Sequence, residues 1–384
     1  MSIFVTDTHY CMLFYSTNGS HITSQARGVN NDITSYLTIF SGLQQCDIPY
    51  IAPSYTQLHL YTHPPDPTTM LAIIGGSGKI GGATLSALLS ENLLDASSII
   101  CTTSATSSSD HRWTSLAACG VTVRHATFDK PDTLRSALHG ATALYLVSTP
   151  VISMDFNNAH HGSGREKHHF AAIDASVEAG VKHIYYTSLA FASPSKAGVM
   201  QAHIRTEAYL KQIQETKGVD YTVLREGLYN ESWPLYFGHY DVGKDERGVV
   251  KVGGDSKISW TGIADLGLAN ALVLVAPREQ WAGRTVYLSN TKESRTIAEV
   301  AAMVSKAKGR DIRLEVVSRQ EHERYYVEER KMDKAMIEWW ASTYDALRDE
   351  ECLIKDDTFD KLLASKGRTP KRVEDTVSEM IRAA

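Results

Sequence analysis

Residues 71–81 read LAIIGGSGKIG. Four consecutive apolar residues are typical of a buried strand, and the glycines at 75, 78 and 81 have the spacing of a phosphate-binding loop that leads into a helix. Gly75 permits a tight turn off the strand, Gly78 removes a side chain that would hold a phosphate away from the backbone, and Gly81 lets the helix pack closely. The free N–H groups at the start of that helix attract an anion. The stretch therefore predicts the pyrophosphate site of a nicotinamide dinucleotide.

Outward from this loop, apolar strands alternate with amphipathic helices. This pattern predicts an α/β fold, a Rossmann doubly wound parallel sheet with a smaller C-terminal α/β substrate lobe, whose ligand lies beyond the carboxyl ends of the strands. We expect the Rossmann core over about 70–225 and 261–290, and the lobe over about 226–260 and 291–384. The expected strands are 71–74, 98–103, 121–125, 143–147, 183–187 and 221–224, and the expected helices are 80–90, 129–140, 165–179, 201–217 and, in the lobe, 319–347.

Residues 1–69 differ from the rest of the chain. They contain a single basic residue, Arg27, no lysine and no glutamate, and they show no sustained helical or strand period. They lack the basic and apolar regions of a secretory signal. We expect this segment to be either a disordered tail or upstream sequence translated from a wrong start codon, with the NAD(P)-binding domain beginning at Met70.

The composition and charge of the chain argue against several classes of protein. A net charge of −5 gives no electrostatic reason to expect nucleic acid as a partner, and no apolar run is long enough to cross a membrane. The five cysteines are scattered without a C-x-x-C pair, which favours a reducing compartment, and we expect the cytoplasm. The histidines at 160, 161, 168 and 169 have no evident carboxylate partners, so we expect no metal site. The sequence does not indicate an oligomeric state.

Beyond the loop, several segments resemble the NmrA-like atypical short-chain dehydrogenases, and within them the bacterial NADPH:quinone oxidoreductase type. The resemblance covers nearly all of residues 70–384 and none of 1–69. The segments that carry it are GVTVRHATFDKPDTLRSALHG (120–140), AGVKHIYYTSL (179–189), HIRTEAYL (203–210), YTVLREGLYNES (221–232) and, more weakly, VGGDSKISWTGIADLGLANALVLV (252–275) and KDDTFDKLL (355–363).

The resemblance implies a set of cofactor contacts, and the sequence departs from the family pattern after the second strand, at Glu226 and at Leu228, which replaces an aromatic residue. The family's basic residue after the second strand falls near Ser104, where a hydroxyl bonds either form of the ribose; Arg112 lies within reach, so NADP is favoured by the resemblance and NAD stays open. The family's Arg-Asn-Gly is Arg225-Glu226-Gly227 here, which changes the charge of the expected substrate wall. The implied cofactor contacts are Gly75, Gly76, Ser77, Gly78, Lys79, Ile80, Ser104, Ser148, Thr149, Pro150, Met200, Gln201, Ala202, His203, Ile204, Arg205 and Arg225.

The helix after the fifth strand lacks the Y-x-x-x-K acid pair of ordinary short-chain dehydrogenases. It carries His203 and Glu207, which share a helix face. His203 is a candidate proton donor oriented by Glu207, or only a hydrogen-bonding group beside the nicotinamide with Glu207 at the surface. Tyr229 is a candidate to stack on a flat acceptor, or a packed junction residue.

Without that acid pair, the chemistry favours acceptors that do not become a strongly basic alkoxide. We therefore expect an NAD(P)H-dependent oxidoreductase that transfers hydride to a small quinone, enone or iminium, with a place in a biosynthetic pathway as one possibility. The alternative is a non-catalytic redox sensor that binds the dinucleotide and regulates a protein partner. An open pocket lined by Tyr229, Trp233, Tyr236 and Phe237 would favour the enzyme, whereas a closed or charged surface would favour the sensor. The aromatic residues 325, 326, 339 and 340 face either the acceptor or a neighbouring helix.

Overall fold

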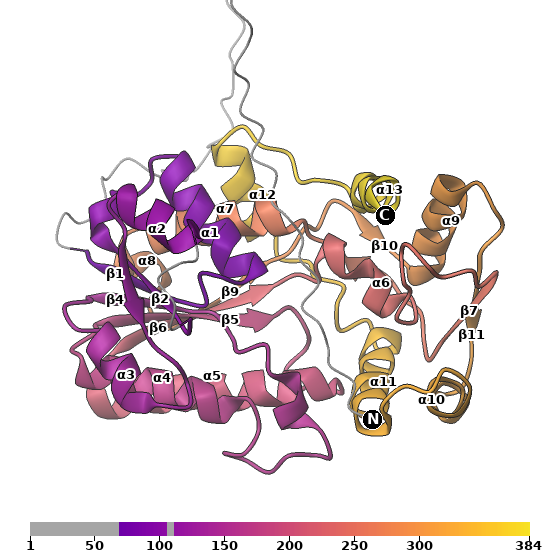
Figure 1. Cartoon of the computed structure of the whole chain (residues 1–384), viewed down its shortest axis with the longest axis horizontal. Helices are drawn as coiled ribbons and strands as arrows, with labels where there is room; N and C mark the ends of the chain where they lie inside the picture. The colour runs from indigo at the N-terminus through magenta and orange to yellow at the C-terminus, as the bar shows by residue number, and fades with distance from the viewer. Residues whose placement is uncertain (1–68, 106–110) are drawn as a thin grey trace, which may run out of the picture. The chain divides into compact units, whose positions relative to one another are not determined.

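The computed structural model describes residues 69–105 and 111–384. The expected N-terminal extension therefore lies outside the described residues, apart from Thr69. The described part is built on a parallel sheet of seven strands in the order β3-β2-β1-β4-β5-β6-β9, which confirms the predicted Rossmann architecture (Figure 1). The strands are β1 (Leu71–Ile74), β2 (Ile99–Thr103), β3 (Thr122–His125), β4 (Ala143–Leu146), β5 (His183–Leu189), β6 (Asp220–Glu226) and β9 (Arg284–Leu288).

Helices cover both faces of this sheet, as parallel strands require (Figure 1). On one face, α1, α2, α7 and α12 bury apolar side chains against the sheet; on the other, α3, α4 and α5 do so. These helices are α1 (Lys79–Ser90), α2 (His111–Ala118), α3 (Pro131–Ala137), α4 (Glu166–Glu178), α5 (Gly198–Lys217), α7 (Ile263–Leu274) and α12 (Thr358–Ser365), with the short α8 (Arg278–Trp281) before β9. Among the described residues, no helix combines the length and apolarity needed to cross a bilayer.

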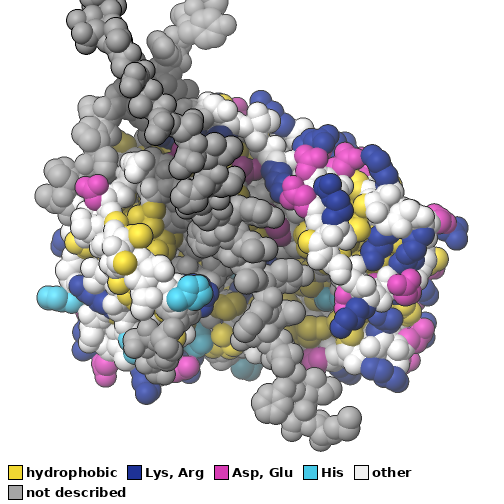
Figure 2. Space-filling model, turned by 45° about the horizontal axis from the view of Figure 1, so that its top comes forward, with side chains coloured by type: hydrophobic (Ala, Val, Ile, Leu, Met, Phe, Trp, Pro, Cys, Tyr) yellow, Lys and Arg dark blue, Asp and Glu magenta, His cyan; other side chains and the backbone are white. Residues whose placement is uncertain are grey.

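The remaining elements form a lobe with a core of its own at the carboxyl side of the sheet (Figure 1). Two small sheets belong to it, β7 paired in parallel with β11 and β8 paired antiparallel with β10. On the face drawn in Figure 2, acidic and basic side chains are interspersed over this side of the molecule. Its elements are α6 (Trp233–Tyr236), β7 (Val249–Val252), β8 (Ile258–Ser259), β10 (Ser294–Arg295), α9 (Ile297–Lys308), β11 (Arg313–Val316), α10 (Arg319–Arg324), α11 (Lys334–Arg348) and α13 (Val373–Ala383).

Two details differ from the sequence expectation. The single helix expected over 319–347 is wrong: α10 ends at Arg324, a π-helical turn occupies Tyr325–Glu329, and α11 begins at Lys334 after Asp333 caps it through its side chain. Between this turn and α11 the chain leaves the helical path, with Lys331 at φ +59°, and the spacing of apolar residues in the sequence does not mark this break. Moreover, α12 packs on α7 at the sheet, although its residues lie within the segment assigned to the lobe.

The contact between α1 and α7 sets the position of the phosphate loop, and it depends on Gly267. A Cβ atom added there would lie 2.6 Å from the backbone carbonyl carbon of Ala83. Because backbone cannot yield as a flexible side chain does, any larger residue would push α7 away from α1.

We therefore expect Gly267→Ala to lower the free energy of unfolding by about 1–3 kcal/mol, despite the better helix propensity of alanine. Gly82→Ala, on α1, is the matched control because its added Cβ would approach only the Gly76 carbonyl oxygen, at 3.4 Å. That control is expected to be neutral or stabilising by up to about 1 kcal/mol. Urea unfolding of the two variants tests this; equal stabilities would contradict the packing argument.

Candidate active site

The loop after β1 has the geometry of an anion cradle. Gly75 adopts φ +93°, and a Cβ added there would lie 2.7 Å from the Cβ of Val147. The N–H of Gly78 donates to the Gly75 carbonyl at 3.0 Å, and the first helical bond runs from Gly82 to Gly78. Within the described chain, α1 has no side-chain cap and no acidic residue in its first turn. The amides of Lys79, Ile80 and Gly81 therefore remain available to a phosphate.

Gly81 has a different role from the expected one. A Cβ added to Gly81 would lie 2.2 Å from the carbonyl oxygen of Gly75. The close approach is thus between the helix and its own loop, and not between the helix and the sheet. The glycine keeps the loop folded tightly over the start of α1.

The segments after β2 and β4 border this cradle. Ser104 is exposed at the end of β2, just before the residues 106–110 that are not described, and Arg112 has its guanidinium 5.7 Å from the ring centroid of Trp113. The amide of Ser148 donates to the hydroxyl of Thr187 on β5 at 2.9 Å. The amide of Thr149 donates to His169 Nε2 at 3.1 Å, whereas Pro150 is exposed.

His203 lies at the end of a chain of hydrogen bonds that fixes its protonation. His169 Nε2 accepts from the Thr149 amide, so its Nδ1 carries the proton and faces the hydroxyls of Thr206 and Tyr186, at 2.9 and 3.2 Å. The Tyr186 hydroxyl in turn lies 2.9 Å from His203 Nδ1. Thr206 donates to the Ala202 carbonyl, which leaves the Tyr186 proton to His203. His203 is therefore a neutral imidazole with its proton on Nε2.

Burial keeps this imidazole neutral. Loss of solvent, reinforced by the positive charge of Arg165, lowers the pKa of His203 well below its usual range. A side chain of this kind donates a hydrogen bond but does not serve as an imidazolium acid near pH 7. The geometry thus favours the hydrogen-bonding alternative for His203.

The expected pairing of His203 with Glu207 is wrong. The Glu207 carboxylate binds the Arg225 guanidinium at two points, with Oε2 at 2.7 Å from Nη2 and Oε1 at 3.2 Å from Nε. It also accepts from the Ser188 hydroxyl at 2.6 Å. A charged guanidinium outcompetes a neutral imidazole for a carboxylate, because a charge-assisted bidentate pair is the stronger interaction.

The ion pair with Glu207 also determines the position of the Arg225 side chain. Its side chain is buried, and the guanidinium also donates to the Phe191 carbonyl and to the Tyr287 hydroxyl. The resemblance implied a cofactor contact for Arg225; in this structure its hydrogen-bonding nitrogens bind protein groups. Its role is to join β5, β6, β9 and α5 at the edge of the site.

The other implied contacts on α5 are divided between interior and surface. Met200 is buried in the lobe core, Ala202 is buried, Gln201 is exposed and Ile204 is half-buried. Arg205 pairs with the buried Glu166 at 2.9 Å. Beside it, the buried pair of Arg165 and Asp155, at 2.6 Å, ties the segment after β4 to α4. Sequence patterns gave no sign of this second pair.

Glu226 is a site residue whose position the sequence did not predict. Its carboxylate is fully buried and faces α7, away from the substrate wall where a change of charge was expected. Oε2 accepts from the Tyr229 hydroxyl at 2.6 Å, and Oε1 accepts from Asn270 Nδ2 at 2.8 Å. Burial raises the pKa of Glu226 to about 7, although these two hydrogen bonds oppose the rise. The departure from Arg-Asn-Gly was the only sequence signal for it.

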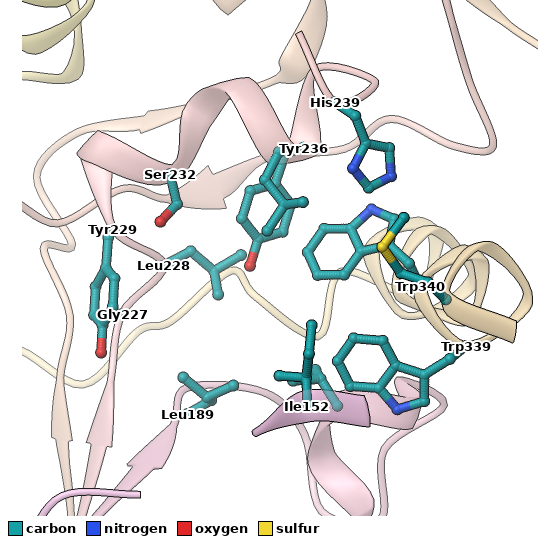
Figure 3. Close-up of a pocket in the computed structure, with 13 residues that line it drawn as sticks. Ile152, Leu189, Gly227, Leu228, Tyr229, Ser232, Tyr236, His239, Trp339 and Trp340 are labelled. Carbon is teal, nitrogen blue, oxygen red and sulfur yellow. The ribbon is translucent and has the colours of Figure 1, made fainter. Parts of the chain in front are cut away.

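An apolar cavity of about 190 Å³ opens beyond the carboxyl ends of β5 and β6. Figure 3 shows the aromatic rings of Tyr229, Tyr236, Trp339 and Trp340 around it. Trp233 and Phe237, which were expected to line it, are buried in the lobe core instead, because α6 turns them inward. The lining residues are Ile152, Leu189, Val199, Gly227, Leu228, Tyr229, Ser232, Leu235, Tyr236, His239, Met336, Trp339 and Trp340.

The comparisons with known proteins agree with this arrangement. Residues 67–348 match the NmrA-like family. The chain belongs to the NmrA-like family. Two NmrA-like relatives are similar in sequence: an NmrA-like family domain-containing oxidoreductase of Aspergillus flavus is 28% identical over 249 residues, 64% of this chain and 74% of that protein. Quinone oxidoreductase 2 of Escherichia coli is 30% identical over 243 residues, 63% of this chain and 76% of that protein.

Two solved structures are also similar to this chain. An NADPH-dependent quinone oxidoreductase of Escherichia coli, complexed with NADPH, superposes with a TM-score of 0.65 and 27% identity, covering 81% of this chain and 99% of that one. The triphenylmethane reductase of Citrobacter sp., complexed with NADP(H), superposes with a TM-score of 0.63 and 25% identity over the same shares. The chain is an NAD(P)H-dependent oxidoreductase of the NmrA-like family.

The buried carboxyl of Glu226 predicts a pH-dependent stability. The pKa of about 7 in the folded state lies above the 4.5 of an ordinary glutamate, so folding favours the protonated form. The contribution of Glu226 to stability is therefore fully present below about pH 4.5 and is lost as the pH rises through 7.

Glu226→Gln removes the titration, and its amide can still accept from Asn270 through Oε1 while Nε2 donates to the Tyr229 hydroxyl oxygen, which reverses that bond. Relative to the unaltered chain, its free energy of unfolding is expected to rise by on the order of 3 kcal/mol between pH 4.5 and pH 8. Glu215→Gln, at an exposed position of α5, is the control and should show no such trend. Denaturant unfolding at pH 5 and pH 8 measures it; a difference independent of pH would contradict the assignment.

Proposed function

We propose that this chain transfers hydride from NADPH to a small, flat quinone, enone or iminium acceptor held in the cavity beyond β5 and β6. The observation that carries the proposal is the position of that cavity. It is apolar, it is walled by aromatic rings, and it lies at the same edge of the sheet as the phosphate cradle. In a Rossmann fold, the reactive end of a dinucleotide extends along this edge from the cradle.

The residues present fit the dinucleotide. The cradle of Gly75 to Ile80 would hold the pyrophosphate on free amides, and Ser148 and Thr149 would border the nicotinamide half. When bound, the reduced nicotinamide supplies a hydride. His203 would then offer its Nε2 proton as a neutral hydrogen-bond donor.

The choice of NADPH and of the acceptor class is part of this proposal. The related Escherichia coli and Citrobacter enzymes were solved with NADPH or NADP(H), and their names give a quinone and triphenylmethane dyes as acceptors. Neither kind of acceptor becomes a strongly basic alkoxide, so neither needs the tyrosine and lysine that α5 lacks.

We also keep the cytoplasm as the expected location, on the ground of the scattered cysteines.

An open apolar cavity is the feature that favours an enzyme over a redox sensor. A sensor needs the dinucleotide site and a surface for its partner but has no use for a ring-lined space beside the nicotinamide. Exposed apolar side chains at Ile152 and Leu235 border this space, as the entrance to a small-molecule site requires.

The first test is binding and turnover with the full chain. Titration should give tighter binding of NADPH than of NADH, and the protein should then reduce a naphthoquinone. Gly78→Val places a branched side chain over the loop amides, so we expect at least a hundredfold weaker NADPH binding with quinone binding retained. Tight NADPH binding without turnover of quinones, enones or iminium dyes would favour the sensor instead.

The role of His203 is tested by two variants. His203→Ala removes the donor, and His203→Gln keeps an N–H group near the position of Nε2. We expect kcat to fall about tenfold in the alanine variant and less in the glutamine variant. Unchanged turnover in both variants would remove His203 from the site.

A further inference from the structure

The end of β6 connects a buried carboxyl group to the apolar cavity through one phenol. Glu226 is the last residue of β6 and is fully buried. Tyr229, three residues later, lines the cavity, and its hydroxyl lies 2.6 Å from Glu226 Oε2. In Figure 3 the Tyr229 ring lies along one side of the lining residues, with its hydroxyl turned toward the strands. A single hydroxyl group thus lies between the buried carboxyl group and the space proposed for the acceptor.

The carboxyl group of Glu226 has no charged partner in the described part of the chain. Arg225, the preceding residue, points to the opposite face of the sheet, where it forms its ion pair. Asn270 of α7 donates to Glu226 Oε1 at 2.8 Å. The other groups that interact with this carboxyl group are phenols, Tyr229 and, from β4, Tyr145. Burial among these uncharged groups raises the pKa of Glu226 to about 7, so both of its protonation states are populated near neutral pH.

The protonation of Glu226 decides the direction of its hydrogen bond with Tyr229. While the carboxylate is ionised, the Tyr229 hydroxyl donates to it, and burial together with that charge raises the pKa of Tyr229 well above its usual range. Once Glu226 is protonated, its proton lies on Oε2, because Oε1 already accepts from Asn270. Oε2 then donates to the Tyr229 oxygen, and the phenol proton is free to turn to an acceptor in the cavity.

We propose that Glu226 and Tyr229 form a proton-donating pair, in which Tyr229 gives its hydroxyl proton to an oxygen of the acceptor and Glu226 replaces that proton. This inference rests on the proposed function and adds the source of the proton. Tyr229 is the catalytic residue of the pair, because it lines the cavity. Glu226 is a positioning residue, because it acts on the acceptor only through Tyr229.

The proton matters for acceptors that keep the transferred electron pair on oxygen. Hydride addition to the β carbon of an enone breaks the C=C π bond, and an electron pair moves to the carbonyl oxygen. The Tyr229 O–H bond breaks as an O–H bond forms on that oxygen, and the Glu226 O–H bond breaks to restore the phenol. The enol product rearranges to the saturated ketone, and Glu226 regains a proton from water along the same path. A cationic triphenylmethane dye, by contrast, becomes neutral on hydride addition and takes up no proton.

Turnover of these two kinds of acceptor tests the pair. With NADPH and benzalacetone, a neutral flat enone, kcat should fall as the pH rises through the pKa of Glu226, about 7, whereas kcat for crystal violet should show no such step. Glu226→Gln donates permanently to the Tyr229 oxygen but has no proton to give. At pH 6 we expect it to lower the ratio of enone to dye turnover by about tenfold and to abolish the pH step. Tyr229→Phe should lower the same ratio by about a hundredfold.

Two matched controls lie away from the cavity. Glu215→Gln is at an exposed position of α5, and Tyr221→Phe is at the opposite, amino-terminal part of β6. Both should keep the turnover ratio and the pH step of the unaltered chain. If the unaltered chain reduces the enone and Glu226→Gln keeps the pH step, the inference is overturned while the proposed function stands. Reduction of the dye with no turnover of the enone at pH 6 also overturns it.

Absence of turnover with both acceptors would overturn the proposed function, and ligand binding would then decide the inference separately. Coumarin is flat and uncharged and carries a carbonyl oxygen that can accept from Tyr229, whereas naphthalene has no such oxygen. Trp339 and Trp340 line the cavity, so their fluorescence reports the binding of either compound. We expect coumarin, but not naphthalene, to bind at least about threefold more weakly at pH 8 than at pH 6, and Glu226→Gln to remove this difference. Equal dissociation constants for coumarin at the two pH values, or no coumarin binding, refute the pair.

Discussion

The guanidinium of Arg225 ties together the edge of the sheet on which the site is built. It binds Glu207 of α5 at two points and also reaches the Phe191 carbonyl and the Tyr287 hydroxyl. The consecutive elements β5, α5 and β6 and the more distant β9 thus meet at one buried charge. Removal of one partner of a buried ion pair costs about 3–5 kcal/mol, because the other charge is left without compensation. The carboxyl ends of β5 and β6 cannot shift independently while this pair is intact.

Polar groups and apolar groups are separated around this pair. Below the carboxyl ends of the strands, the ion pairs of Arg165 with Asp155 and of Arg205 with Glu166 hold the segment after β4 against α4 and α5. On the lobe side, the wall is aromatic and aliphatic. A neutral acceptor can therefore lie against the apolar wall, while the charges that set the local geometry remain satisfied by one another.

The sequence predicted the framework better than it predicted the contacts within it. The strands at 71–74, 143–147 and 183–187 were placed within a residue or two because buried parallel strands are continuous apolar runs. The sequence revealed the phosphate loop because glycines are needed where the backbone turns tightly and approaches a phosphate. Periodicity did not reveal the π-turn at Tyr325–Glu329 or the non-helical residues between it and α11.

The partners of polar side chains were the main failure, for a physical reason. A spacing of four residues correctly placed His203 and Glu207 on one face of α5, but it gave no information about Arg225, which approaches from β6. In the same way, the aromatic run around 233–237 indicated rings near the acceptor without showing which of them α6 turns inward. Both Tyr236 and Trp233 are aromatic, so the sequence does not distinguish their positions. In the structure, Tyr236 lines the cavity and Trp233 packs in the lobe core.

The tryptophans of α11 follow the last strand of the main sheet by some fifty residues, and they belong to the lobe and not to the Rossmann core. This part of the cavity wall is thus formed by a different segment of the chain from the phosphate cradle. Replacement of Met336, Trp339 and Trp340 would leave the cradle after β1 and the Arg225 ion pair untouched. Substitutions confined to α11 can therefore change the shape of the cavity while the binding of the dinucleotide at the cradle stays the same.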